Sequence, residues 1–129
     1  MNEQRDARLL IAEDEANLRL VLQKELQRLG YRVHVAPDGE AALRKLEESN
    51  VDVLLCDINM PRMDGMELIQ AIRRDYSSVY VIMITAFGTP DTEKQALRNG
   101  ANDYLAKPFD FEELERRVRT FFDTRATSA

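Results

Sequence analysis

The sequence VDVLLCDINMPRMDG spans residues 51–65 and sets a pattern that the rest of the chain repeats. Its first six residues are almost continuously apolar, which is typical of a strand buried on both faces of a parallel sheet. The run ends at Asp57, and the asparagine, proline, aspartate and glycine that follow are turn-forming residues ahead of a helical pattern. Acids at such a point either cap the next helix or react where a buried strand meets solvent.

The alternation of a short apolar run with a helical pattern occurs five times along the chain. The other four runs are RLLIA (8–12), RVHV (32–35), VYVIMIT (79–85) and DYLAK (103–107). Strict alternation favours right-handed crossovers and a parallel sheet that is covered on both faces. The sequence therefore predicts a doubly wound α/β fold with five helices, and the commonest order for five such strands is 2-1-3-4-5.

The helical segments differ in the apolar surface that they carry. The first helix, which ends at Gly30, shows one stripe made of Leu18, Val21, Leu22, Leu26 and Leu29. The last helix, predicted over 111–122, has the same spacing at Phe111, Leu114, Val118, Phe121 and Phe122. Residues 89–99 have little apolar surface beyond Ala96 and Leu97, so we expect this helix to be the most loosely held of the five.

Length and composition indicate a single domain. The chain has 129 residues, of which 44% are hydrophobic and 32% are charged. We predict an N-terminal tail over 1–7, the domain over 8–123, and a tail or the start of a linker over 124–129. Cys56 is the only cysteine, so no internal disulfide can form, and its place in an apolar strand favours a role in the core.

Charge and hydropathy exclude several classes of partner. A net charge of -5 argues against direct binding of nucleic acid by this domain. No apolar run approaches the roughly 20 residues that span a bilayer, and the first residues lack the features of a signal peptide. We therefore expect a cytoplasmic protein with no membrane partner.

Chemically active residue types follow the predicted strands. In doubly wound folds, ligands bind outside the carboxyl ends of the strands, near the point where the winding reverses. In strand order, these ends carry Glu13 and Asp14, then Asp57, then Thr85, and finally Lys107. Each residue alone suits a helix cap or a solvated surface position. Together they place acids, a hydroxyl and an amine at one edge of the sheet.

That combination of groups suits a metal ion and phosphoryl chemistry. Three neighbouring carboxylates would either raise one another's pKa values or hold a cation. Oxygen ligands without nearby cysteine or histidine select a hard ion, and Mg²⁺ suits a shallow site because it keeps several waters. A carboxylate beside a cation, a lysine and a hydroxyl is placed to attack a phosphoryl group whose oxygens those groups stabilise.

With these residues in this order, the chain resembles the receiver domain of bacterial two-component response regulators from about Arg8 to Phe122. The resemblance rests on the acidic pair at 13–14, DINMPRMDGMEL beginning at Asp57, ITA around Thr85, and GANDYLAKPF, which contains Lys107 and Pro108. It implies a flavodoxin-like fold. It also implies a phosphoacceptor signalling domain that catalyses only its own phosphorylation and dephosphorylation.

The resemblance assigns a role to each residue of the site. Asp57 would accept a phosphoryl group from a sensor histidine kinase, from a phosphotransfer protein or from a small donor such as acetyl phosphate. Mg²⁺, or Mn²⁺ in its place, would be held by Glu13, Asp14, Asp57 and the main-chain carbonyl of Asn59. Phe87 and Asn59 occupy family positions that tune dephosphorylation.

The resemblance also implies a conformational switch. Thr85 and Lys107 would bind phosphoryl oxygens, and Thr85 would move toward them. Tyr104 would turn from exposed to buried as Thr85 moves, and the peptide between Lys107 and Pro108 would be cis. Residues 89–122 would form the face that controls an output domain or a partner protein, and a phosphorylation-dependent homodimer through this face is common in the family.

Three alternatives share parts of this pattern. A degenerate receiver could serve as a phosphorylation-independent docking module, although the full set of site residues argues against it. An aspartate-nucleophile phosphatase would need a second aspartate two residues after the first, where this chain has Asn59. A flavodoxin-like nucleotide binder needs a phosphate-cradling loop after the first strand, and the acidic sequence AEDEAN would repel phosphate there.

Overall fold

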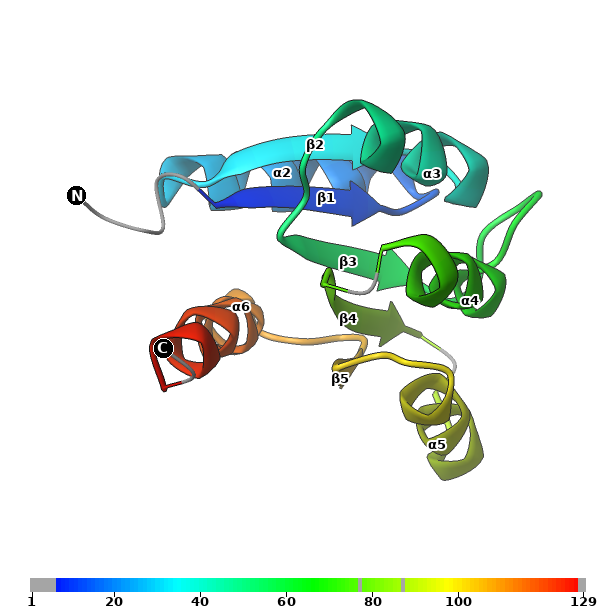
Figure 1. The fold of residues 1–129 in the computed structure, drawn as a ribbon. Helices are drawn as coiled ribbons and strands as arrows, with labels where there is room; N and C mark the ends of the chain where they lie inside the picture. The colour runs from blue at the N-terminus through cyan, green and yellow to red at the C-terminus, as the bar shows by residue number, and fades with distance from the viewer. Residues whose placement is uncertain (1–6, 77, 87, 128–129) are drawn as a thin grey trace.

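Five parallel strands form one sheet in the order β2-β1-β3-β4-β5 in the computed structural model (Figure 1). The strands are β1 (Arg8–Ala12), β2 (Arg32–Ala36), β3 (Val53–Asp57), β4 (Tyr80–Thr85) and β5 (Asp103–Ala106). The helices are α2 (Ala16–Arg28), α3 (Gly39–Glu48), α4 (Gly65–Asp75), α5 (Pro90–Arg98) and α6 (Phe111–Thr127). The structure describes residues 7–76, 78–86 and 88–127, with side chains as far as Phe121. The predicted doubly wound fold and strand order are confirmed.

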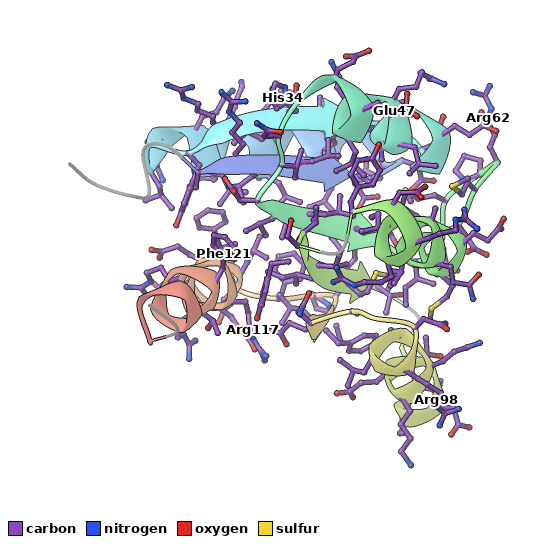
Figure 2. The ribbon with its side chains drawn as sticks, viewed as in Figure 1. His34, Glu47, Arg62, Arg98, Arg117 and Phe121 are labelled. Carbon is purple, nitrogen blue, oxygen red and sulfur yellow. The ribbon has the colours of Figure 1, made fainter. Side chains whose placement is uncertain are left out.

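Each face of the sheet has its own core because successive strand residues point to opposite sides. Leu9 and Ile11 pack with buried side chains of α2 and α6. Leu10 packs on the other face with buried side chains of α3, α4 and α5. Figure 2 shows side chains in the space between the sheet and its helices, including Phe121 of α6. All five residues of β3 are buried, which explains why the stretch that precedes Asp57 shows no polar alternation.

Helix α2 buries a narrower stripe than the sequence predicted. Leu22 and Leu26 are fully buried, whereas Val21 is 54% exposed and Leu29 is 41% exposed. The side chains of neighbouring helix residues point about 100° apart. When Leu22 points into the core, the side chain of Val21 therefore points away from it. Leu29 follows the last helical residue, Arg28, and therefore lies beyond the stretch that packs.

Helix α6 is longer than the sequence pattern predicted. Helix α6 continues to Thr127, beyond residue 122 where the sequence pattern placed its end. Residues 123–127 contain no glycine or proline, so no stop signal interrupts the helix there. The side chain of Phe122 lies outside the described side chains. Before β1, Ala7 is buried and its main-chain carbonyl accepts a hydrogen bond from the Arg32 amide at 3.1 Å, so this residue of the predicted tail packs with the domain.

Helix α5 is the least buried of the helices whose side chains are described throughout. Ala96 is its one buried residue, Leu97 is 43% exposed, and Arg98 projects away from the sheet (Figure 2). The helix begins after Thr89, whose hydroxyl accepts a hydrogen bond from the Thr92 amide at 3.1 Å. None of the helices in the described part of the chain is both long enough and apolar enough to cross a membrane.

Candidate functional site

The carboxyl ends of four strands meet at one edge of the sheet, because all five strands run parallel. The side chains that follow or end these strands are Glu13 and Asp14 from β1, Asp57 from β3, Thr85 from β4 and Lys107 from β5. A cavity of about 320 Å³ opens at this edge and is lined by Glu13, Asp14, Glu15, Asp57, Asn59, Ala86 and Lys107. The structure therefore brings together the residues that the sequence placed at one site.

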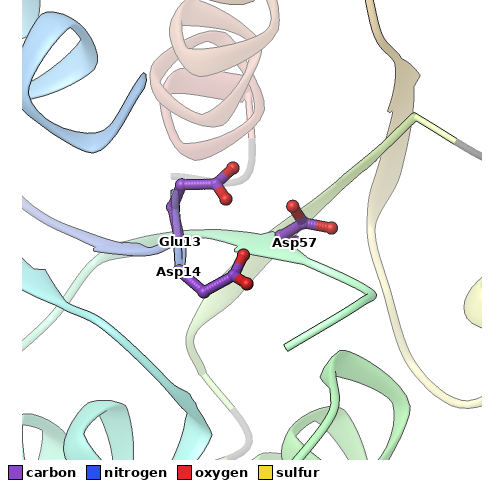
Figure 3. A group of neighbouring side chains, drawn as sticks. All are labelled: Glu13, Asp14 and Asp57. Atoms are coloured by element: carbon purple, nitrogen blue, oxygen red, sulfur yellow. The ribbon is translucent and has the colours of Figure 1, made fainter. Parts of the chain in front are cut away.

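Three carboxylates face a common space in this cavity (Figure 3). Glu13, Asp14 and Asp57 each offer an oxygen atom, and these atoms lie within 4.8 Å of one another. Glu13 and Asp57 are buried, whereas Asp14 is exposed to solvent. The group thus combines two anchored acids with one acid at the mouth of the cavity.

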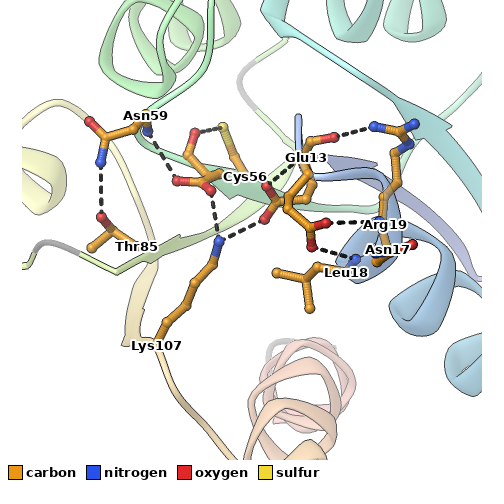
Figure 4. Close-up of polar contacts among 10 residues, drawn as sticks. Glu13, Asn17, Leu18, Arg19, Cys56, Asn59, Thr85 and Lys107 are labelled. Atoms are coloured by element: carbon orange, nitrogen blue, oxygen red, sulfur yellow. Dashed lines mark hydrogen bonds and ion pairs between the residues drawn. The ribbon is translucent and has the colours of Figure 1, made fainter.

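The amine of Lys107 bridges the two buried acids (Figure 4). Its Nζ atom donates to Glu13 Oε1 at 2.9 Å and to Asp57 Oδ2 at 2.8 Å. Burial works to lower the pKa of Lys107, but its hydrogen bonds and charge interactions with the two acids outweigh burial and raise it. Lys107 is therefore a fixed positive charge beside Asp57.

Glu13 carries the most strongly shifted carboxyl group of the site. Burial raises the pKa of Glu13 from 4.5 to about 7, and the negative charge of Asp57 adds to the rise. Hydrogen bonds from Lys107 and from the Glu15 main-chain amide act in the opposite direction without cancelling the effect of burial. The carboxylate form of Glu13 is thus costly in this structure unless further positive charge approaches it.

Asn59 links the carboxylate of Asp57 to the hydroxyl of Thr85. The main-chain amide of Asn59 donates to Asp57 Oδ1 at 3.0 Å. The side-chain amide of Asn59 donates to Thr85 Oγ1 at 3.4 Å, and Thr85 itself is buried at the end of β4. Both oxygens of Asp57 therefore accept hydrogen bonds, one from Asn59 and one from Lys107.

Tyr104 lies in β5, in register with Met83 of the neighbouring strand β4. Its ring packs against the core on the α5 side of the sheet, and its hydroxyl oxygen is buried with no hydrogen-bond partner among the described residues. The peptide bond between Lys107 and Pro108 is cis, as the resemblance implied. Phe87 lies outside the described residues.

Two residues that support the site were not predicted from the sequence. The guanidinium of Arg19, on α2, donates to the main-chain carbonyl of Glu13 at 2.8 Å and so holds the peptide between Glu13 and Asp14, which follow β1 (Figure 4). Cys56 packs beneath the site and its thiol donates to the Asp57 carbonyl at 3.4 Å. The sequence offered one signal for Arg19, a cation one to two helical turns after an acidic run, but nothing in that signal names its acceptor.

Comparison with known proteins identifies the family. Residues 9–119 match the family model of the response regulator receiver domain. The chain belongs to the response regulator receiver family. The receiver is 44% identical over 112 residues to a probable transcriptional regulator, ycf27, of Guillardia theta, in an alignment that covers 87% of the receiver and 44% of the relative. The receiver thus spans less than half the length of the curated relatives of this kind that it matches.

Solved structures of receivers have the same fold. A receiver domain protein from Methanospirillum hungatei superposes with a TM-score of 0.90 at 25% identity, and the match covers 95% of this chain and 98% of that one. The response regulator TrrA of Thermotoga maritima, whose structure is a complex with Mg²⁺ and BeF, superposes with a TM-score of 0.81 at 34% identity. That match covers 89% of the receiver and 98% of TrrA.

Proposed function

We propose that this receiver accepts a phosphoryl group on Asp57 in a Mg²⁺-dependent reaction and thereby switches the face formed by residues 89–122. The observation that carries the proposal is the environment of Asp57. Its carboxylate lies in a cavity with two further acids, and Lys107 and the Asn59 amide hold its two oxygens at 2.8 and 3.0 Å. A carboxylate positioned in this way is oriented for attack on an incoming phosphorus atom.

The donor groups of the cavity fit a hydrated Mg²⁺ ion. All three acids offer oxygen, and their ligand atoms span no more than 4.8 Å. Mg²⁺ keeps several of its waters, so it binds at a site that is open to solvent on the side of Asp14. We assign its protein ligands to Glu13, Asp14, Asp57 and the main-chain carbonyl of Asn59, with Mn²⁺ as an alternative ion. When bound, the ion supplies positive charge that offsets the charge of the acids and of the phosphoryl oxygens.

The groups around Asp57 also define the protein's part in the transfer. One oxygen of Asp57 forms the new bond to phosphorus, and the electron pair of the broken bond leaves with the donor group. Lys107 remains beside Asp57 and stabilises the phosphoryl oxygens by charge. Thr85 Oγ1, which accepts from the Asn59 side-chain amide, would turn to donate its hydroxyl hydrogen to a phosphoryl oxygen, because that oxygen is a charged acceptor.

The movement of Thr85 connects the site with the output face. Thr85 ends β4, and helix α5 begins soon after it at Pro90. A hydrogen bond that draws Thr85 toward Asp57 favours one arrangement of this connection over another. We assign the phosphodonor to a sensor histidine kinase or phosphotransfer protein of the cytoplasm. The switched face would contact an output domain, a partner protein or a second copy of the receiver.

The proposal is tested by labelling with acetyl phosphate, with and without Mg²⁺, followed by intact-mass measurement and hydroxylamine treatment. We expect a Mg²⁺-dependent gain of one phosphoryl group that hydroxylamine removes, since acyl phosphates are labile to it. Asp57→Asn should abolish the gain. Asp64→Asn is the matched control, because Asp64 caps α4 by accepting from the Glu67 amide at 2.9 Å and asparagine caps equally well.

Three outcomes would contradict the proposal. Undiminished labelling of Asp57→Asn would show that another residue is the phosphoacceptor. Absence of labelling, combined with absence of Mg²⁺ binding in a titration, would favour the docking module instead. Steady release of phosphate from a free phosphate ester would favour the aspartate-nucleophile phosphatase.

A further inference from the structure

Tyr104 is partly buried, and the position of its hydroxyl group depends on the absence of a side chain beside it. The ring packs against the core on the α5 side of the sheet, and the hydroxyl oxygen is buried without a hydrogen-bond partner among the described residues. Burying such a hydroxyl costs free energy that a hydrogen bond does not recover here. The buried position therefore rests on packing of the ring and on room for the oxygen.

Gly88 provides that room. A Cβ atom built on Gly88 would overlap the Tyr104 hydroxyl oxygen, at a separation that real Cβ atoms do not show. The same Cβ atom would lie 3.1 Å from Tyr104 Cζ and 3.1 Å from the Thr85 methyl carbon. Residue 88 thus faces both members of the pair that we propose to move together.

The backbone does not require glycine at this position. Among the described glycines, those with positive φ are Gly30 and Gly100, so the conformation of Gly88 is open to other residues. Gly88 is also exposed, and the three atoms nearest to an added Cβ all belong to Tyr104 and Thr85. A side chain at residue 88 would therefore act first on Tyr104 and Thr85.

We infer that Gly88 is a positioning residue for Tyr104, which admits the tyrosine hydroxyl to its buried position by having no side chain. The inference rests on the proposed function, in which Tyr104 and Thr85 form the switch. A larger residue at 88 would hold the Tyr104 ring outward and weaken the coupling between Asp57 and the output face. The hydroxyl is the end of a side chain that turns about χ1, so the overlap is relieved most easily by rotating the ring out of the core.

The first test measures the exposure of Tyr104 directly. The protein is labelled with ¹³C at tyrosine Cζ, and the Tyr104 signal is assigned by its loss in Tyr104→Phe. A soluble paramagnetic chelate should broaden this signal severalfold more in Gly88→Ala than in the unsubstituted protein. The other tyrosine signals serve as internal references, because a general loosening of the fold would broaden them as well. Unchanged broadening of Tyr104 in Gly88→Ala would overturn the inference.

The second test asks whether removing the hydroxyl relieves the effect of alanine. In Gly88→Ala combined with Tyr104→Phe, the nearest ring atom is Cζ, at a separation of 3.1 Å that a small shift accommodates. We expect Gly88→Ala to reduce the phosphorylation-dependent change in amide exchange of α5, and the double variant to recover most of it. A purely structural defect at residue 88 would leave the double variant at least as impaired as the single one.

The two proposals fail in different ways. The paramagnetic measurement uses unmodified protein, so it reports on Gly88 whether or not Asp57 accepts a phosphoryl group. If Asp57 never labels while Gly88→Ala exposes Tyr104, the proposed function fails and the role of Gly88 stands. If Asp57 labels and Tyr104 stays buried in Gly88→Ala, the role of Gly88 fails alone.

Discussion

The carboxyl group of Glu13 is completely buried, so its protonation state depends on the charges and hydrogen bonds around it. Burial raises its pKa from 4.5 to about 7. In the unfolded chain the same group titrates near 4.5, so the folded state binds the proton more tightly. The resulting stabilisation is complete below about pH 4.5 and is lost as the pH rises through about 7.

Glu13→Gln should therefore flatten the pH dependence of stability. Without divalent ions, the free energy of unfolding of the unsubstituted protein should fall between pH 5.5 and pH 8, because Glu13 then ionises at a buried site. Glutamine carries no charge at either pH, so its variant should lose less stability over this range. Urea unfolding, followed by circular dichroism at several pH values, measures how steeply the free energy of unfolding of each protein falls with pH.

Two controls make the experiment specific to the site. Glu47→Gln replaces an exposed acid of α3 and should keep the slope of the unsubstituted protein. Saturating Mg²⁺ should remove most of the decrease in the unsubstituted protein, because an ion that binds the ionised acids stabilises the folded state. Equal slopes in Glu13→Gln and the unsubstituted protein would show that another group causes the dependence.

At the scale of elements, α5 and α4 differ in how firmly they hold the sheet. Helix α4 buries Gly65, Leu68, Ile69, Ala71 and Ile72, whereas α5 buries Ala96 alone. A helix with a small buried surface opens at low free-energy cost without unfolding the rest of the domain. Helix α5 is thus suited to change its packing while α4 stays in place.

Amide exchange should separate the two helices. Peptides that cover residues 90–98 should exchange hydrogen for deuterium at least about tenfold faster than peptides that cover 65–75, because opening α5 exposes little apolar surface. Leu97→Ala, at an exposed position of α5, should change stability by less than about 1 kcal/mol, whereas Leu68→Ala in α4 should cost about 3 kcal/mol. Equal exchange in both helices would exclude α5 as the mobile element.

Sequence reasoning succeeded where a single segment carried the information. The apolar run before Asp57 predicted a strand buried on both faces, and the residues that follow the strands predicted the composition of the site. It failed where the answer depends on contacts between distant segments. The hydrogen bond between Lys107 and Glu13 joins residues 94 positions apart, and the Tyr104 hydroxyl on β5 approaches Gly88 in the loop after β4. The spacing of apolar residues likewise does not indicate how many of them α2 buries, so the sequence wrongly predicted that Val21 packs against the sheet.

At the scale of the whole molecule, Arg73 connects three parts of the fold. Its guanidinium donates to the Gly100 carbonyl and the Val79 carbonyl at 2.8 Å each, and to Asn102 Oδ1 at 2.7 Å. Asn102 Oδ1 also accepts from the Val81 amide at 2.8 Å. Arg73 therefore ties the end of α4 to the start of β4 and to the turn before β5. Partial burial lowers the pKa of Arg73.

Replacing this arginine should destabilise the whole domain. Arg73→Met should lower the free energy of unfolding by about 2–4 kcal/mol, because it removes the donor from two partly buried carbonyl oxygens, those of Gly100 and Val79. Arg74→Met is the matched control. Arg74 is the next residue of α4, its side chain is exposed, and its ion pair with Asp75 spans 4.0 Å, so we expect a change within about 0.5 kcal/mol. Urea unfolding measures the free energy of unfolding of both variants. Equal losses of this free energy in the two variants would show that helix propensity, and not the contacts of Arg73, causes the effect.

The burial of Cys56 makes the receiver convenient for spectroscopy. It is the only thiol of the chain, it is fully buried, and its pKa is raised, first by burial and then by the charge of Asp57. Reagents that attack thiolates at neutral pH should leave it unmodified while the fold is intact. A cysteine introduced on the surface of α5 would then take up a maleimide dye or a nitroxide alone. Motion of that helix could be followed in a protein that keeps its natural residue beneath Asp57.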